Sequence, residues 1–308
     1  MNTLLKIVKN RNTILILAIV LGISVGDIAQ NIKEYTFYIL ATVLSFSTTG
    51  IVMEDIKNKK FFISSMAQGI LLNYLLFGTT LVALAYFFAD NASLFNGFVV
   101  IAVSPPGVAI IPFSSMLKAN VNRSTIGTAA GFLVAIFLAP IMIKILTGNN
   151  ELKFMPLFYN MVKIIIVPFI ISRILLLNTV KKITLKVRGQ VVNWGFALII
   201  FTAVGINRHI FIYHLDEVFK VGLILFIAMF ILGQTYDYII KRWVSDERER
   251  MSQNLLLTLK SSGFSVVVSL QLFGGDAVIP SAVLSVLVLA YLLFLTFKSS
   301  FLQWIWKK

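Results

Sequence analysis

The sequence contains no cysteine among its 308 residues, only two histidines and few charged side chains. The lack of cysteine excludes disulfides, thiolate metal sites and a cysteine nucleophile. The histidines, His209 and His214, share one short polar loop, which argues against a buried histidine-rich metal site. Charged residues make up 13% of the chain, whereas soluble domains usually have about 25%. This shortage excludes a water-soluble enzyme and a nucleic-acid-binding module.

Hydrophobic residues are abundant instead, at 58% of the chain with a mean hydropathy of +0.90. The apolar runs are continuous and not alternating, which indicates membrane-spanning helices of about 20 residues and not barrel strands. We predict an all-α integral membrane protein, without a separate soluble domain, in the plasma (inner) membrane. The ten predicted spans are 13–31, 35–53, 61–88, 94–117, 123–146, 155–177, 190–207, 216–240, 252–273 and 277–301.

The net charge of +14 follows the predicted topology. With ten spans, nineteen of the 27 Lys and Arg fall on one side of the membrane and five on the other. Because cytoplasmic loops are enriched in Lys and Arg, both termini are expected in the cytoplasm. Most of the net charge is therefore topological and is not a partner-binding patch; membrane lipid is an expected partner, and nucleic acid is not. The nineteen are Lys6, Lys9, Arg11, Lys57, Lys59, Lys60, Lys118, Arg123, Lys181, Lys182, Lys186, Arg188, Lys241, Arg242, Arg248, Arg250, Lys298, Lys307 and Lys308.

Two predicted spans are interrupted. The fourth contains Ser104-Pro105-Pro106-Gly107 and then Pro112, and the ninth contains the polar run 260–263. Gly107 and Gly263 stand 156 positions apart, and each break falls in the fourth span of a set of five. Five is odd, so the second set would enter the bilayer from the opposite side, as in two inverted five-helix repeats. Broken helices at matching positions indicate a transporter's binding site.

The interrupted helices have groups that could bind a solute but none that could catalyse a chemical reaction. A half-helix that ends inside the membrane presents free N–H groups to an anion or free C=O groups to a cation. The hydroxyl groups near the breaks have no base beside them that could activate a nucleophile. The sequence also shows no buried carboxylate pair and no metal-ligand cluster. We therefore expect no catalytic residue, metal or cofactor, and no enzyme.

Lys260 is the most conspicuous charged residue, because it lies eight positions into its span, about 12 Å at helical rise. A buried ammonium costs several kcal/mol unless it is paired. Lys260 could hold an anionic substrate, occupy a cation site permanently or carry a coupling proton; its side chain could also extend to the cytoplasmic surface. A polar stripe in the third span, with Gln68 and Asn73, fits a site or ordinary hydrogen bonding between helices.

With ten spans and breaks in the fourth and ninth, the sequence resembles the bile acid:sodium symporter family, whose superfamily includes arsenite and auxin efflux carriers. The resemblance is sharpest at Pro106-Gly107 through Leu117, with Asn120-Val121 and Pro140, and at Ser262-Gly263 through Pro280. It implies a core of helices 61–146 and 216–301, in which the broken fourth and ninth helices cross, against a panel of helices 13–53 and 155–207. The substrate would lie between panel and core, and Gln68 stands where the family has a sodium-ligating glutamine.

The sequence departs from this family at its sodium sites. Leu256 and Lys260 stand where the symporters have a glutamate and a glutamine, and Ile111-Pro112 replaces a Ser-Asn pair. The polar sodium ligands of the fifth helix are replaced by the apolar run 132–138. The resemblance thus implies the fold, while sodium is the less expected coupling ion because an ammonium would repel it.

We therefore predict a secondary transporter of a small organic anion that works by alternating access, with H⁺ or no coupling ion. Two alternative functions remain. One is a cation/proton antiporter, which normally needs mid-membrane aspartates, and the other is a channel or non-transporting receptor. The predicted substrate site comprises Pro106, Gly107, Ser114, Ser115, Lys260, Ser261, Ser262 and Gly263, and the predicted coupling residues are Lys260, Gln68 and Thr258.

Overall fold

The computed structural model describes residues 11–51, 58–148 and 152–305, and every regular element in these ranges is helical. The all-α prediction is therefore confirmed. The predicted cytoplasmic cations Lys6, Lys9, Lys57, Lys307 and Lys308 lie outside the described residues. Six helical stretches of the described chain are long and apolar enough to cross a membrane: Thr13–Gly50, Lys59–Phe88, Val121–Thr147, Phe154–Ile174, Asn178–Ile206 and Asp276–Lys298.

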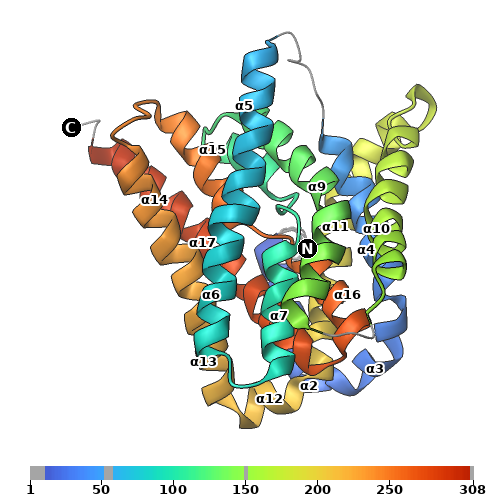
Figure 1. Ribbon diagram of the computed structural model, residues 1–308. Helices are drawn as coiled ribbons and strands as arrows, with labels where there is room; N and C mark the ends of the chain where they lie inside the picture. Colours follow the sequence, from blue (N-terminus) through green and yellow to red (C-terminus); the bar gives the residue numbers. More distant parts are fainter. Residues whose placement is uncertain (1–10, 52–57, 149–151, 306–308) are drawn as a thin grey trace.

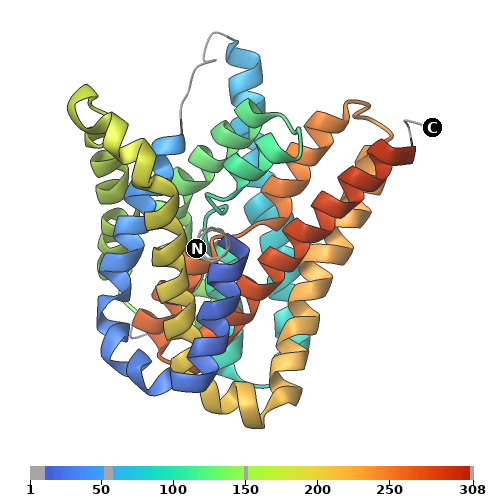
Figure 2. The same ribbon diagram turned by 180° about the vertical axis from the view of Figure 1, so that it is seen from behind.

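Three features separate this count of six from the ten predicted spans. The run Thr13–Gly50 holds two of the predicted spans, α2 (Arg11–Val25) and α4 (Thr36–Ser47), and the chain reverses direction between them at α3 (Ala29–Ile32) (Figures 1 and 2). The two interrupted spans are each divided into two helices, and the longer apolar pieces, α7 (Ala92–Val103) and α16 (Ser262–Phe273), are too short to count among the six. The predicted span 216–240 is helical over 215–240 but is not among the six.

Local sequence signals explain where several helices begin. Asn58, Asn91 and Asn120 each accept a hydrogen bond from the backbone N–H three residues ahead, and Asp246 accepts one from two residues ahead. These side chains satisfy N–H groups that a helix start leaves unpaired. The helices that they cap are α5 (Lys59–Ile70), α7, α9 (Val121–Thr147) and α15 (Glu247–Thr258).

The long helices of the two halves carry π-helical turns at matching positions. Turn η4 (Leu71–Gly78) joins α5 to α6 (Thr79–Phe88), and turn η5 (Ile227–Ile231) joins α13 (Leu215–Phe226) to α14 (Leu232–Ile240). Lys59 and Leu215 are 156 positions apart, as are Leu71 and Ile227. Figure 1 shows that α5 to α6 and α13 to α14 run in opposite directions.

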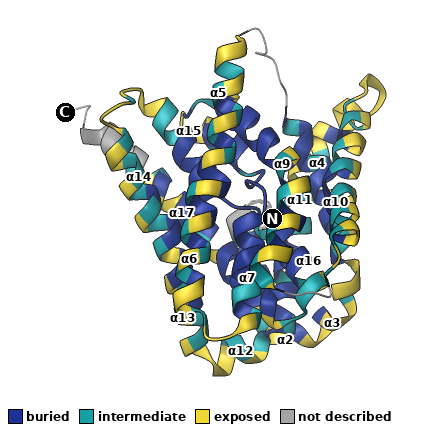
Figure 3. Ribbon diagram, in the orientation of Figure 1, coloured by how far each residue is buried: buried dark blue, intermediate teal, exposed yellow. Residues whose placement is uncertain are grey.

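The remaining helices complete a bundle with two distinguishable sides. Helix α11 (Asn178–Ile206) packs on α2 and α4, and α10 (Phe154–Ile174) packs on α4 and α9. On the other side, α13 and α14 flank α17 (Ile279–Ile305), while the short helices α8 (Ile110–Met116) and α12 (Arg208–Tyr213) connect longer ones (Figures 1 and 2). Figure 3 shows the buried residues concentrated in the middle of the bundle and the exposed residues along its outside.

Candidate functional site

The first break lies between α7 and α8. Helix α7 ends at Val103 because Pro105 and Pro106 have no backbone N–H to continue it, and Ser104, which precedes a proline, is extended (φ −66°, ψ 148°). Helix α8 begins at Ile110. Pro112 is tolerated in its first turn, where backbone N–H groups have no helical partner.

The second break lies between α15 and α16, at residues 259–261. Leu259 is extended (φ −93°, ψ 103°), and Ser262 already belongs to α16. The predicted break over 260–263 is therefore displaced towards the N-terminus, and Gly263 lies in the first turn of α16. Its packing explains the glycine, since a Cβ there would lie 2.6 Å from the ring of Phe196.

The two breaks cross and pair through their backbones. The Gly107 N–H donates to the Leu259 carbonyl (2.9 Å), and the Ser261 N–H donates to the Pro105 carbonyl (3.0 Å). Pro106 and Lys260 thereby form a single antiparallel bridge. This pairing satisfies backbone groups that the two interruptions leave without helical partners, and it fixes the half-helices against one another.

The Lys260 ammonium lies beside this crossing and is only 2% exposed. It donates to Asn73 Oδ1 (2.7 Å), the Ala102 carbonyl (2.8 Å) and the Ser104 carbonyl (3.0 Å). Its Nζ also lies 4.7 Å from the ring centre of Tyr74 and 5.4 Å from that of Phe77. All three N–H donors are therefore satisfied, and the charge sits at the carboxyl end of α7, where a helix dipole favours a cation.

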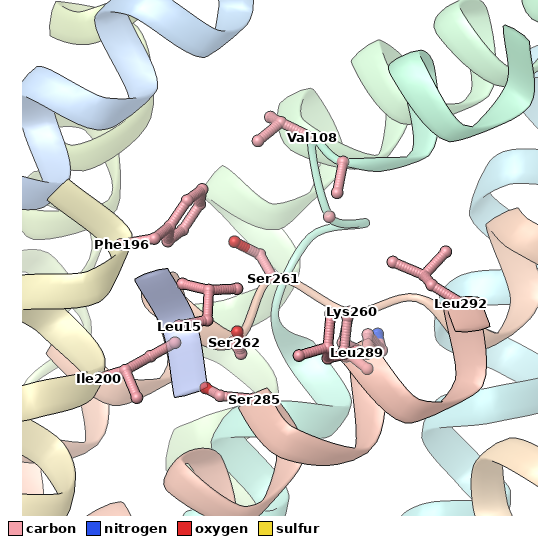
Figure 4. Close-up of a pocket in the computed structure, with 13 residues that line it drawn as sticks. Leu15, Val108, Phe196, Ile200, Lys260, Ser261, Ser262, Ser285, Leu289 and Leu292 are labelled. Atoms are coloured by element: carbon pink, nitrogen blue, oxygen red, sulfur yellow. The ribbon is translucent and has the colours of Figure 1, made fainter. Parts of the chain in front are cut away.

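A small cavity of about 30 Å³ lies on the crossing, between α11 and α17 (Figure 4). Gly107, Val108 and Ala109 line it just before α8, and Ser261 and Ser262 line it at the start of α16. Figure 4 shows Phe196 and Ile200 on one side of the cavity and Lys260 and Leu292 on the other. The Ser261 hydroxyl is buried and has no hydrogen-bond partner among the described residues.

A larger cavity of about 650 Å³ shares Val108, Ala109 and Phe196 with the small one. Most of its lining is apolar, with Arg188 and Asn193 among the few polar groups. The Arg188 guanidinium donates to the carbonyl of Ser47 at the end of α4 (3.2 Å). From the sequence, Arg188 is expected only to contribute to the cytoplasmic charge, and its position in the lining of a cavity is not predicted. A few placed polar groups in an apolar cavity of this size are typical of small-molecule sites.

A comparison with protein-family models matches the chain over residues 12–306 to the SBF-like CPA transporter family. The chain belongs to this family. The membership confirms the resemblance to bile acid:sodium symporters, supports a multi-pass membrane transporter and agrees with the expectation that the protein is not an enzyme. A comparison with individual curated proteins gave no match.

In this SBF-like transporter, Gln68 belongs to a second polar cluster, centred on Arg123. The Arg123 guanidinium is buried, donates to Gln68 Oε1 (2.6 Å) and pairs with Glu249. Gln253 donates to the same oxygen of Gln68 (3.3 Å). The charge distribution predicts Arg123 only as a cytoplasmic topological charge, whereas the structure buries its side chain, which joins α5, α9 and α15. The Gln68 oxygen thus faces a guanidinium.

The other predicted hydroxyls do not line the small cavity. Ser114 donates to the Ser124 hydroxyl (2.7 Å), and Ser115 is exposed on α8. Thr258 is buried and donates to the carbonyl of Asn254 (2.8 Å), one turn back in α15. The crossing therefore brings together Pro106, Gly107, Lys260, Ser261, Ser262 and Gly263.

Three residues that contact the Lys260 ammonium were not assigned to the site from the sequence. Asn73, Tyr74 and Phe77 all come from turn η4, whose wider turn carries them inside the bundle. Asn73 was visible in the sequence only as part of a polar stripe. Such π turns are frequent at functional sites, but the sequence carries no local signal for this one.

Proposed function

We propose that the protein is a secondary active transporter that moves a small organic anion by alternating access. The observation that carries this proposal is the cavity on the crossing. The starts of two half-helices line it, together with the Ser261 hydroxyl, which has no hydrogen-bond partner in the part of the chain that the structure describes. Helix starts present N–H groups and partial positive charge, so the site favours a negatively charged group. The larger apolar cavity beside it suits the body of such a solute.

The alternating-access mechanism rests on two inverted five-helix repeats. The constant spacing of 156 residues supports this, because it relates the two breaks, the two π turns and the starts of α5 and α13. The opposite directions of the corresponding helices support it as well (Figure 1). Repeats of opposite orientation give the protein two comparable conformations, each open to one side of the membrane.

We propose that a core moves against a panel. The panel comprises α2, α4, α10 and α11, and the core comprises the helices within 61–146 and 216–301. The larger cavity lies between Phe196 and Arg188 of the panel and Val108 and Phe113 of the core. The distribution of Lys and Arg assigns the end of the bundle that carries the starts of α5 and α15 to the cytoplasm, together with both termini.

Lys260 takes the place of a bound cation in this proposal. Its three oxygen contacts and two aromatic rings form a complete cation site that is already occupied by the protein's own ammonium. Sodium is then not required. The ammonium serves either as a fixed charge, which leaves transport without a coupling cation, or as a group that loses and regains a proton during the cycle.

Uptake into proteoliposomes tests this function. We expect organic anions with an apolar body to enter in the absence of sodium, and a pH gradient separates the fixed charge from the proton-coupled form. In the proton-coupled form, Lys260→Gln should abolish the response of uptake to pH, while Lys182→Gln, an exposed change of equal charge, should not. Strict sodium dependence that survives Lys260→Gln would refute the assignment.

A cation/proton antiporter is the second candidate, because the carbonyls of Ala102 and Ser104 already bind a cation at the crossing. Against it, the described oxygen contacts of the Lys260 ammonium are one amide and two carbonyl oxygens, with no carboxylate among them. Proton-driven sodium or potassium flux without anion uptake would favour this candidate. Steady conductance in planar bilayers would instead favour a channel.

A further inference from the structure

A third cavity, separate from the crossing, lies between α14, α15 and α17. It has a volume of about 270 Å³, and its charged lining consists of Lys241, Arg250, Lys298, Asp237 and Glu247. Figures 1 and 2 show α14 and α17 side by side at the end of the bundle where α15 begins. This is the end that the Lys and Arg distribution assigns to the cytoplasm.

Two cationic side chains of this cavity, Arg250 and Lys298, share the carboxylate of Asp237, and Lys298 also donates to Gln234 Oε1 (2.6 Å). One carboxylate oxygen of Asp237 pairs with the Lys298 ammonium (3.0 Å), and the other lies 3.5 Å from Arg250 Nε. Arg250 Nε is buried and makes no hydrogen bond within the described chain, while its Nη1 donates to the Val244 and Ser245 carbonyls. Lys241 is exposed at the rim. The three cations outnumber the two carboxylates.

The aromatic residues around the cavity place it at the membrane surface. Tyr238 lines the cavity and Trp243 follows the end of α14, and each side chain is 72% exposed. Exposed Tyr and Trp of this kind mark the level of the lipid headgroups. A cationic cavity at this level, between helices that face lipid, lies within reach of the phosphate groups of the bilayer.

We propose that this cavity binds the phosphate group of an anionic phospholipid of the cytoplasmic leaflet. A phosphodiester supplies two acceptor oxygens for Arg250 and Lys241, which form the strong charge-assisted kind of hydrogen bond. Phosphatidylglycerol matches the excess positive charge of the lining. Phosphatidylcholine binds less well, because its own ammonium group opposes the cations at the rim.

Thermal unfolding and native mass spectrometry of the purified full-length protein, with added phosphatidylglycerol, phosphatidylcholine or inorganic phosphate, test the proposal. Phosphatidylglycerol should raise the unfolding temperature and remain bound, whereas phosphatidylcholine should do so less. Lys241→Gln changes an exposed side chain, so folding should persist, and it should weaken phosphatidylglycerol binding about fivefold. Lys182→Gln, on the same side but outside the cavity, should leave binding unchanged.

Equal effects of the two lipids, or an equal loss in both variants, would overturn the proposal. Inorganic phosphate that matches and displaces phosphatidylglycerol at the same concentration would also overturn it, because the ligand would then be a free anion. Lys298→Gln provides a second variant inside the cavity, and it should weaken lipid binding in the same direction as Lys241→Gln.

Discussion

Two buried cations of this transporter are held in different ways. Arg123 is paired with the carboxylate of Glu249, as buried guanidinium groups usually are. Lys260 has amide and carbonyl oxygens and aromatic rings around its ammonium, and its described contacts include no carboxylate. The first arrangement joins helices, while the second places an isolated positive charge beside a cavity. That difference is the reason to assign the transport role to Lys260.

Lys260→Met should destabilise the protein. The substitution leaves Asn73 Oδ1 and two carbonyls buried without their donor, and each unsatisfied group costs about 1–3 kcal/mol. Removal of the buried charge offsets part of this cost, so we expect a net loss of about 2 kcal/mol in the free energy of unfolding, measured as a lower unfolding temperature in detergent. Lys182→Met is the matched control and should have little effect. An unfolding temperature that is unchanged or raised in Lys260→Met would contradict the described position of the ammonium.

At the scale of elements, the two breaks differ in what causes them. Pro105 and Pro106 end α7 through local chemistry, so the sequence alone locates that break. The second break contains no proline, and its position follows from pairing with residues 105–107, some 156 positions away along the chain. Local sequence therefore predicts that the ninth span is interrupted, but places the interruption one to two residues too late.

The contact between α9 and the first break gives a test at this scale. A Cβ on Gly131 would overlap the ring of Pro106, whereas a Cβ on Gly189, in α11, would meet no atom within 4 Å. Gly131→Ala should thus displace the first break and lower the unfolding temperature. Gly189→Ala should be neutral or stabilise the helix by about 0.5–1 kcal/mol. Equal effects of the two substitutions would show that α9 does not support the break.

For the whole molecule, the apolar runs predicted the helices, and the local sequences at 104–107 and 260–263 predicted that two spans are interrupted. Contacts between distant segments could not be predicted in the same way. Arg123 looks like a loop charge because its partner Glu249 stands 126 positions away. Arg188 likewise resembles a loop charge in the sequence, because only the packing of α11 on α4 brings it to the larger cavity. Hydropathy and charge therefore predict helices and orientation, while the composition of the site depends on tertiary packing.

Accessibility of Ser262 from the two sides of the membrane tests the central claim most directly. Because the chain has no cysteine, Ser262→Cys introduces a single thiol, at a half-buried position on the small cavity. A core that moves against a panel exposes this position to each side in turn. A membrane-impermeant thiol reagent should therefore modify it when added from the cytoplasmic side and, in a separate experiment, from the opposite side. Modification from one side alone, or from neither, would contradict alternating access at the crossing.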